Sequence, residues 1–225
     1  MSKMKFGTLT AALAAIAFSG AANATLVTSD AGYTGPVLNL GAYQNGQYNF
    51  TFGPVALPGG ITFTRDHSTS NSGLGAVVGQ GSYGLNGNGS FDSNPTYIGL
   101  DGANATGTFA LAAPVSSIGF YFNYAPGVGA DPIIAALDSS GNVFESWDLA
   151  TFAPISTPGG LNQFEFRGIS ESTADIYGLQ FSGSYLLATG TANGDVIPTI
   201  PEPANVALLL AGLGLMGFMA RNRKA

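Results

Sequence analysis

The sequence predicts an all-β fold, an antiparallel jelly-roll-like β-sandwich spanning residues 25–196. Short runs of alternating apolar and polar residues recur along the chain, with the period of a half-buried strand. Turns rich in Gly, Asn and Pro separate these runs at intervals of roughly 8–12 residues. No window of this region has a convincing helical stripe, and about 170 residues suffice for one sandwich with a single core.

The strongest runs place large apolar side chains on one face of each predicted strand. These side chains are Ile118, Phe120, Phe122 and Tyr124 in one run, Phe164 and Phe166 in a second, and Tyr177, Leu179 and Phe181 in a third. Further strands are expected at residues 61–64, 75–78, 96–100 and 106–111. We expect residues 68–94, rich in Gly and Asn, to form long loops around one or two weak strands.

Two hairpins are also predicted. Asn45-Gly46 lies at the centre of residues 43–48, and Asn-Gly is the strongest short-range turn signal. Residues 133–137 and 143–149 flank a second, longer loop.

The first 24 residues have the three zones of a secretory signal peptide. Lysines 3 and 5 give a cationic start, residues 9–18 are apolar apart from one Thr, and Ala22 and Ala24 supply the small-x-small pattern that signal peptidase accepts. We therefore expect export through the Sec machinery and removal of this segment.

A second apolar run, residues 204–220, contains a single polar residue. As a helix it would be about 25 Å long at 1.5 Å per residue, the short limit for crossing a bilayer. Arg221, Arg223 and Lys224 follow at once, and cationic flanks stay in the cytoplasm. The sequence predicts a transmembrane helix with the β domain outside and residues 221–225 as a basic cytoplasmic tail.

A linker, residues 197–203, joins the β domain to this helix and ends in Pro201-Glu202-Pro203. Two prolines around one residue hold the backbone extended, a form that a processing enzyme can engage. The order of this motif, an apolar helix and terminal basic residues resembles the PEP-CTERM sorting signal of Gram-negative bacteria. The resemblance covers residues 200–225.

The resemblance implies that a membrane-embedded exosortase recognises Pro201, Glu202 and Pro203. The tail would then be a temporary membrane anchor, removed before delivery to the cell surface or the extracellular matrix. It further implies a link to exopolysaccharide and biofilm. Residues 115–120, 136–143 and 164–169 resemble, more loosely, a sandwich domain common in such proteins. Related domains often end in a strand with paired acidic residues, and this chain has none there.

The charged residues divide unevenly along the chain. Five of the seven Lys and Arg residues lie in the two terminal segments, so residues 25–203 keep two Arg against all 13 acidic residues, a formal net charge of −11. Such a domain does not bind nucleic acid or anionic lipid by charge. It has no Cys, which excludes disulfides and thiol chemistry.

The candidates for chemistry are weak. His67, beside Asp66, is the only imidazole base, and no nucleophile elbow accompanies it. Residues 79–84 match the dinucleotide-binding glycine pattern, but a Gly- and Asn-rich stretch follows where a helix would be required. The carboxylates that could serve glycoside hydrolysis are scattered through the chain; they include Asp148, Glu165 and Glu171.

Two loops carry oxygen ligands of the kind that Ca²⁺ prefers, residues 92–96 and 101–104, although neither completes an EF-hand pattern. Trp147 and outward Tyr residues could stack on sugar rings, although core packing explains most of them. We predict no catalytic residues, no metal ligands and no cofactor, with a structural Ca²⁺ left open.

Three functions remain. The first is a non-enzymatic protein of the cell surface or matrix. The second is a carbohydrate-binding adhesin module, with or without Ca²⁺, and the third is a secreted glycan-active hydrolase. Binding to a glycan array with and without chelator separates the first two, and the third requires turnover that disappears when one specific carboxylate is replaced.

Overall fold

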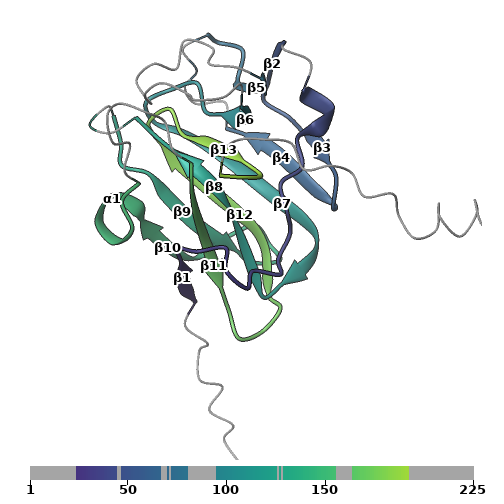
Figure 1. The fold of residues 1–225 in the computed structure, drawn as a ribbon, viewed down its shortest axis with the longest axis vertical. Helices are drawn as coiled ribbons and strands as arrows, with labels where there is room; N and C mark the ends of the chain where they lie inside the picture. The colour runs from purple at the N-terminus through teal and green to yellow at the C-terminus, as the bar shows by residue number, and fades with distance from the viewer. Residues whose placement is uncertain are drawn as a thin grey trace, which may run out of the picture.

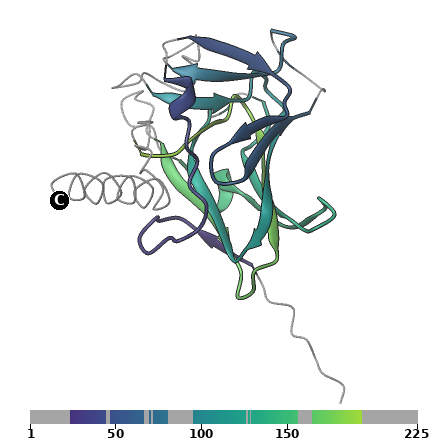
Figure 2. The same cartoon turned by 90° about the vertical axis from the view of Figure 1, so that its right-hand side faces the viewer.

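A computed structural model describes residues 24–44, 47–66, 70, 72–80, 95–125, 127, 129–155 and 164–192. Within this part of the chain the protein is all-β, with two short helices (Figures 1 and 2). The strands are β1 (Thr25–Val27), β2 (Tyr48–Thr51), β3 (Val55–Leu57), β4 (Ile61–Arg65), β5 (Ala76–Gln80), β6 (Thr96–Gly99), β7 (Ala105–Val115), β8 (Ser117–Asn123), β9 (Ile133–Leu137), β10 (Val143–Asp148), β11 (Glu165–Ser170), β12 (Ile176–Gly183) and β13 (Leu187–Thr189). The helices are η1 (Gly41–Tyr43), a 3₁₀ turn, and α1 (Leu149–Phe152).

The strands form two sheets in which every pair is antiparallel. The seven-stranded sheet has the order β1-β11-β8-β13-β6-β5-β2, and the six-stranded sheet has the order β10-β9-β12-β7-β4-β3. The predicted all-β class is therefore confirmed, and the two sheets are those of a β-sandwich.

Aromatic rings from both sheets meet in the core between them. Phe120 of the seven-stranded sheet contacts Phe109 of the six-stranded sheet edge-on, with ring centroids 4.9 Å apart. Phe122 contacts Phe181 across the sheets as a tilted pair, with ring centroids 5.7 Å apart. All four side chains are at most 1% exposed. The predicted alternation in β8 and β12 thus fills the space between the sheets.

The predicted hairpin at residues 133–149 is confirmed, because β9 and β10 pair directly and α1 begins where β10 ends (Figure 1). Its loop is ordered by Asp138, whose carboxylate accepts hydrogen bonds from the backbone N–H groups of Ser140 and Asn142, at 2.8 and 2.9 Å. These hydrogen bonds hold the pKa of the Asp138 carboxyl below its usual value.

Two sequence predictions were wrong in detail. The strand pairing of the predicted hairpin around residues 43–48 is not found among the described residues: Tyr43 ends the 3₁₀ turn η1, and β2 pairs with β5 instead. The predicted alternation at Phe166 is confirmed, and this side chain lies on the outer face of the seven-stranded sheet, where it packs on Tyr121. The other wrong prediction concerns β12. Tyr177 stays half-buried, because a bulge in the pairing of β12 with β7 turns Ile176 into the core instead.

Several predictions fall outside the described residues. They are the signal-peptide zones through Ala22, the linker at 197–203 with Pro201-Glu202-Pro203, the apolar run 204–220, and the basic tail with Arg221, Arg223 and Lys224. The turn at Asn45-Gly46, His67 and residues 92–94 are also outside. Of the helices that the structure describes, none has the length and apolar character needed to cross a membrane.

Candidate functional site

The three carboxylates considered for glycoside hydrolysis have separate structural settings. Asp148 caps α1, accepting hydrogen bonds from the N–H groups of Ala150 and Thr151 at 2.9 and 3.3 Å. Glu165 forms an ion pair with Arg167 at 2.6 Å. Glu171 lies just after β11, and its backbone N–H bonds to the carbonyl of Ser116. Asp148 and Glu165 therefore have structural roles, the first as a helix cap and the second as an ion-pair partner.

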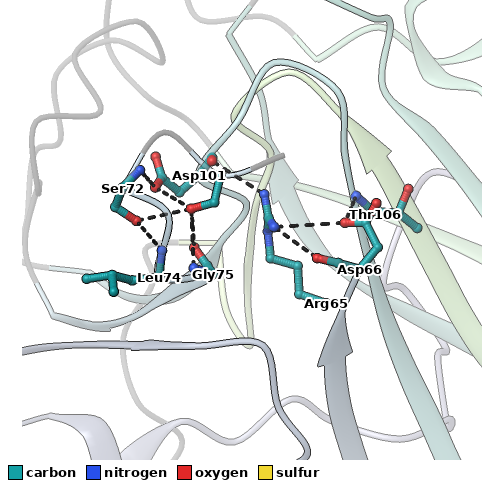
Figure 3. A network of polar contacts seen from close by, with 8 residues as sticks. Arg65, Asp66, Ser72, Leu74, Gly75, Asp101 and Thr106 are labelled. Carbon is teal, nitrogen blue, oxygen red and sulfur yellow. Dashed lines mark hydrogen bonds and ion pairs between the residues drawn. The ribbon is translucent and has the colours of Figure 1, made fainter. Parts of the chain in front are cut away.

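In the loop at residues 101–104, side-chain oxygen atoms accept hydrogen bonds from donor groups of the protein itself. The Asp101 carboxylate accepts hydrogen bonds from the Ser70 hydroxyl at 3.0 Å and the Ser72 backbone N–H at 2.7 Å (Figure 3). The Asn104 side chain accepts one from the N–H of Ala130 at 3.1 Å. Asp101 thereby ties the segment before β5 to the turn after β6. Among the described residues, no group of three or more His, Asp or Glu is placed to hold a metal; a structural Ca²⁺ stays a prediction.

Both Arg residues of the β domain are buried. Arg65 is 3% exposed, and its guanidinium donates to the backbone carbonyls of Asp66 and Asp101 at 3.0 and 3.4 Å (Figure 3). Burial lowers the pKa of Arg65, while the charges of Asp66 and Asp101 act in the opposite direction. Arg167 is 4% exposed. Because residues 25–203 contain no other Arg or Lys, the surface of this domain presents no Lys or Arg charge.

Glu171 is a carboxylate in an unfavourable setting. Its side chain is 9% exposed, and its Oε2 atom is buried without a hydrogen-bond partner. Burial raises the pKa of the Glu171 carboxyl, and the charges of Asp175 and Glu145 raise it further. A carboxyl whose pKa is raised in the folded state lowers stability at pH values where it must ionise.

We expect Glu171→Gln to raise the free energy of unfolding at pH 7, by on the order of 1 kcal/mol, because the neutral amide removes the buried charge. The gain should shrink as the pH falls to about 4, where glutamate is largely protonated in the folded and unfolded states. Urea unfolding at both pH values measures this. Asp131→Asn, which removes an exposed charge, is the control and should change little. An equal effect of Glu171→Gln at both pH values would contradict the assignment.

An aromatic cluster lies on the outer face of the seven-stranded sheet, between the segment after β1 and strands β8 and β11. Phe166 meets Tyr33 edge-on, with ring centroids 4.9 Å apart, and meets Tyr121 at 5.4 Å. The Tyr121 hydroxyl donates a hydrogen bond of 2.5 Å to Oδ2 of Asp30. We call the hollow beside these four residues the Tyr33 hollow; its volume is about 170 Å³.

Burial raises the pKa of both tyrosines in this cluster to about 12. For Tyr121, the hydrogen bond with Asp30 and the charge of Asp30 add to the effect of burial. Both phenols therefore stay neutral at physiological pH and can donate hydrogen bonds.

Reasoning from sequence did not single out this cluster. Tyr121 is the outward residue of a strand whose inward residues were identified, so the alternation marks it as an outward aromatic. No local signal marks Asp30 and Tyr33, because they reach the sheet only through the path of the chain after β1. The predicted sugar-stacking role of Trp147 gains no support here, since it packs half-buried against the core between the sheets.

The described residues define a class of protein, an all-β domain with an anionic surface, and a further C-terminal segment follows them in the sequence. That segment shows how the protein is sorted, because residues 199–224 match the family model of the PEP-CTERM protein-sorting motif. The chain carries this motif and is an exported protein, directed to the cell surface by an exosortase. No curated protein and no solved structure matches the chain.

Proposed function

We propose that the protein is a non-enzymatic component of the cell surface or extracellular matrix, with its β domain folded as a jelly-roll-like sandwich. The PEP-CTERM motif carries this proposal, because it directs an exported protein to an exosortase. In the proposed pathway signal peptidase cuts after Ala24, and residues 204–220 anchor the chain in the inner membrane during transit. The exosortase then engages Pro201-Glu202-Pro203.

The β domain supports a role without catalysis. Two of its three candidate carboxylates, Asp148 and Glu165, serve as a helix cap and as the partner of a buried Arg. Its lack of surface Lys and Arg suits a protein that remains soluble among other macromolecules outside the cell. We propose that this environment is an exopolysaccharide matrix or biofilm.

Replacing Pro201 and Pro203 together by Ala should abolish delivery to the surface, because the backbone around Glu202 would no longer be held extended. Mass spectrometry of the released parent protein should find a C-terminus near Pro203, with residues 204–225 missing. The same measurement on the double variant should find little processed protein. Cell fractionation follows where each form accumulates.

Pro198→Ala is the matched control, since it removes a nearby proline that lies outside the matched residues 199–224. It should leave processing unchanged. A host lacking its exosortase should retain the parent protein with its tail intact. Intact tails in matrix material, or normal delivery of the double variant, would refute the sorting mechanism.

The alternative function is a carbohydrate-binding adhesin. One observation favours it, the Tyr33 hollow, where aromatic rings, a carboxylate and a phenol lie together on the outer face of a sheet. Binding to a glycan array with and without a Ca²⁺ chelator tests this alternative and the role of Ca²⁺ together. A glycan-active hydrolase has no comparable observation behind it.

A further inference from the structure

The Tyr33 hollow has a wall that the backbone fixes in place. The Tyr33 hydroxyl accepts a hydrogen bond from the N–H of Gly119 and donates one to the carbonyl of Pro36, both at 2.9 Å. A Cβ atom at Gly119 would lie 2.5 Å from the Phe166 ring, and one at Gly35 would lie 2.4 Å from the Tyr33 hydroxyl. Glycine at position 119 therefore lets the Phe166 ring of β11 lie over β8, and glycine at position 35 lets the segment after β1 approach the backbone of β8 at Ser117. A site whose walls are set in this way needs little ordering on binding.

The hollow offers both apolar and polar surface to a ligand. Its apolar lining includes the half-buried Tyr33 and Tyr121, the 6%-exposed Phe166 and the 49%-exposed side chain of Val37. The polar groups are the exposed Asp30 carboxylate and the Tyr121 hydroxyl, which are joined by a single hydrogen bond. A carboxylate has about four lone-pair sites and a phenol oxygen has two, so both can accept further hydrogen bonds.

A sugar ring combines the features that match these groups. Its C–H bonds carry partial positive charge, which the negative face of an aromatic ring attracts. Its hydroxyl groups donate hydrogen bonds, which the Asp30 carboxylate and the Tyr121 oxygen can accept. Binding sites for small molecules are generally concave and mostly apolar, with a few placed polar groups.

The charge of the domain limits which class of sugar the Tyr33 hollow can bind. Asp30 stands in the hollow itself, and no Lys or Arg side chain is exposed on the domain to balance a second negative charge. A uronic acid or a sulfated sugar would be repelled both by Asp30 and by the formal net charge of −11 over residues 25–203.

A second, larger hollow of about 500 Å³ does not match a sugar as well. It is lined by residues such as Thr34, Gly59, Val115 and Ser116 and has no aromatic ring and no carboxylate. We propose that the Tyr33 hollow binds one neutral pyranose ring of an exopolysaccharide, with Asp30 and Tyr121 as the groups that recognise its hydroxyls. This proposal rests on the proposed function, because it supplies the contact through which a surface protein would be held in the matrix.

The test uses the full chain, purified in a detergent without a sugar headgroup. Saturation-transfer NMR and calorimetry measure binding of neutral oligosaccharides, for which cellohexaose, mannohexaose and a galactan oligomer serve as probes, and of an oligogalacturonate. At least one neutral probe should bind, and the acidic probe should not.

Variants then locate the site. Tyr121→Phe and Asp30→Asn should each weaken binding about 3- to 10-fold, the loss of one hydrogen bond, and Tyr121→Ala should bring it below detection. Tyr177→Phe and Asp175→Asn are the matched controls, since Tyr177 is also half-buried and Asp175 is also exposed. Both controls should bind like the parent. Thermal unfolding confirms that each variant folds.

Three results would overturn this proposal: no neutral probe binds, the Tyr121 and Asp30 variants bind like the parent, or the acidic probe binds as tightly as the neutral ones. None of these affects the sorting function, because surface delivery of the Tyr121→Phe protein is measured separately. If the parent protein itself is not delivered to the surface, the proposed function is refuted. Binding of a sugar in the Tyr33 hollow would then still hold as a separate property.

Discussion

Phe109→Ala should lower the free energy of unfolding by about 3–5 kcal/mol, the range for removing a buried Phe side chain. Phe109 is fully buried in β7, stacks on Phe181 with ring centroids 5.0 Å apart, and meets Phe120 of the opposite sheet at 4.9 Å. Its loss would leave a cavity between the two sheets at the place where their rings interlock. Urea unfolding of the purified protein measures the change.

Phe144→Ala is the control for this prediction, because it removes the same atoms from the edge strand β10, where Phe144 is 42% exposed. It should lower the free energy of unfolding by less than about 1 kcal/mol, since less surface returns to water and no cavity forms. Similar losses for the two variants would show that the rings between the sheets do not hold the sandwich together as described.

Strand positions could be predicted from the sequence because strand periodicity is local. Ile118, Phe120 and Phe122 recur at every second position of one short segment, and Leu179 and Phe181 do the same on either side of a Gln. Alternation says which residues share a face. It does not say which way the face points, and Phe166 shows the difference, since it lies on the outer face of its sheet.

Strand pairing was harder to predict from the sequence, because it depends on segments far apart in the chain. Asn45-Gly46 is a strong turn signal, yet β2 pairs with β5, about thirty positions further along. The pairing is decided by the hydrophobic faces of several strands together, which outweigh a local preference for a turn.

The Tyr33 hollow was invisible to sequence reasoning for the same reason. Asp30 and Tyr121 are 91 positions apart, and only the path of the chain over β8 brings them within hydrogen-bond distance. The sorting signal is the opposite case. All of its elements follow one another in sequence, so residues 199–224 could be recognised without knowledge of the fold.

The arginines show what the structure adds to a count of charges. Composition gives two positive charges in residues 25–203, and burial removes both from the surface. Each guanidinium donates a hydrogen bond to a backbone carbonyl of another segment, Arg65 to Asp101 and Arg167 to Ala153, so each links parts of the chain that are apart in sequence. We therefore expect these two positions to affect stability far more than they affect any interaction with other molecules.

Arg167→Met should lower the free energy of unfolding by about 3–5 kcal/mol, because several backbone carbonyls lose their donors together and each unsatisfied buried group costs about 1–3 kcal/mol. The Arg167 guanidinium donates to the carbonyls of Ala153, Pro154 and Phe166, at 2.9, 3.0 and 2.7 Å. Without these donors, buried carbonyl oxygens lose their partners. Hydrogen exchange should also show that α1, which ends at Phe152, opens more readily.

Two further variants separate the carbonyl contacts from the ion pair. Arg167→Lys should restore only a small part of the loss, because one ammonium group cannot reproduce the planar fork of five donors. Glu165→Gln removes the ion pair alone, and the Glu165 side chain is 36% exposed, so we expect a loss below about 1 kcal/mol. If Glu165→Gln were as damaging as Arg167→Met, the ion pair and not the carbonyl contacts would hold this corner of the domain. A small loss for Glu165→Gln beside a large one for Arg167→Met would instead mean that the buried cation acts through the backbone of the segment after α1.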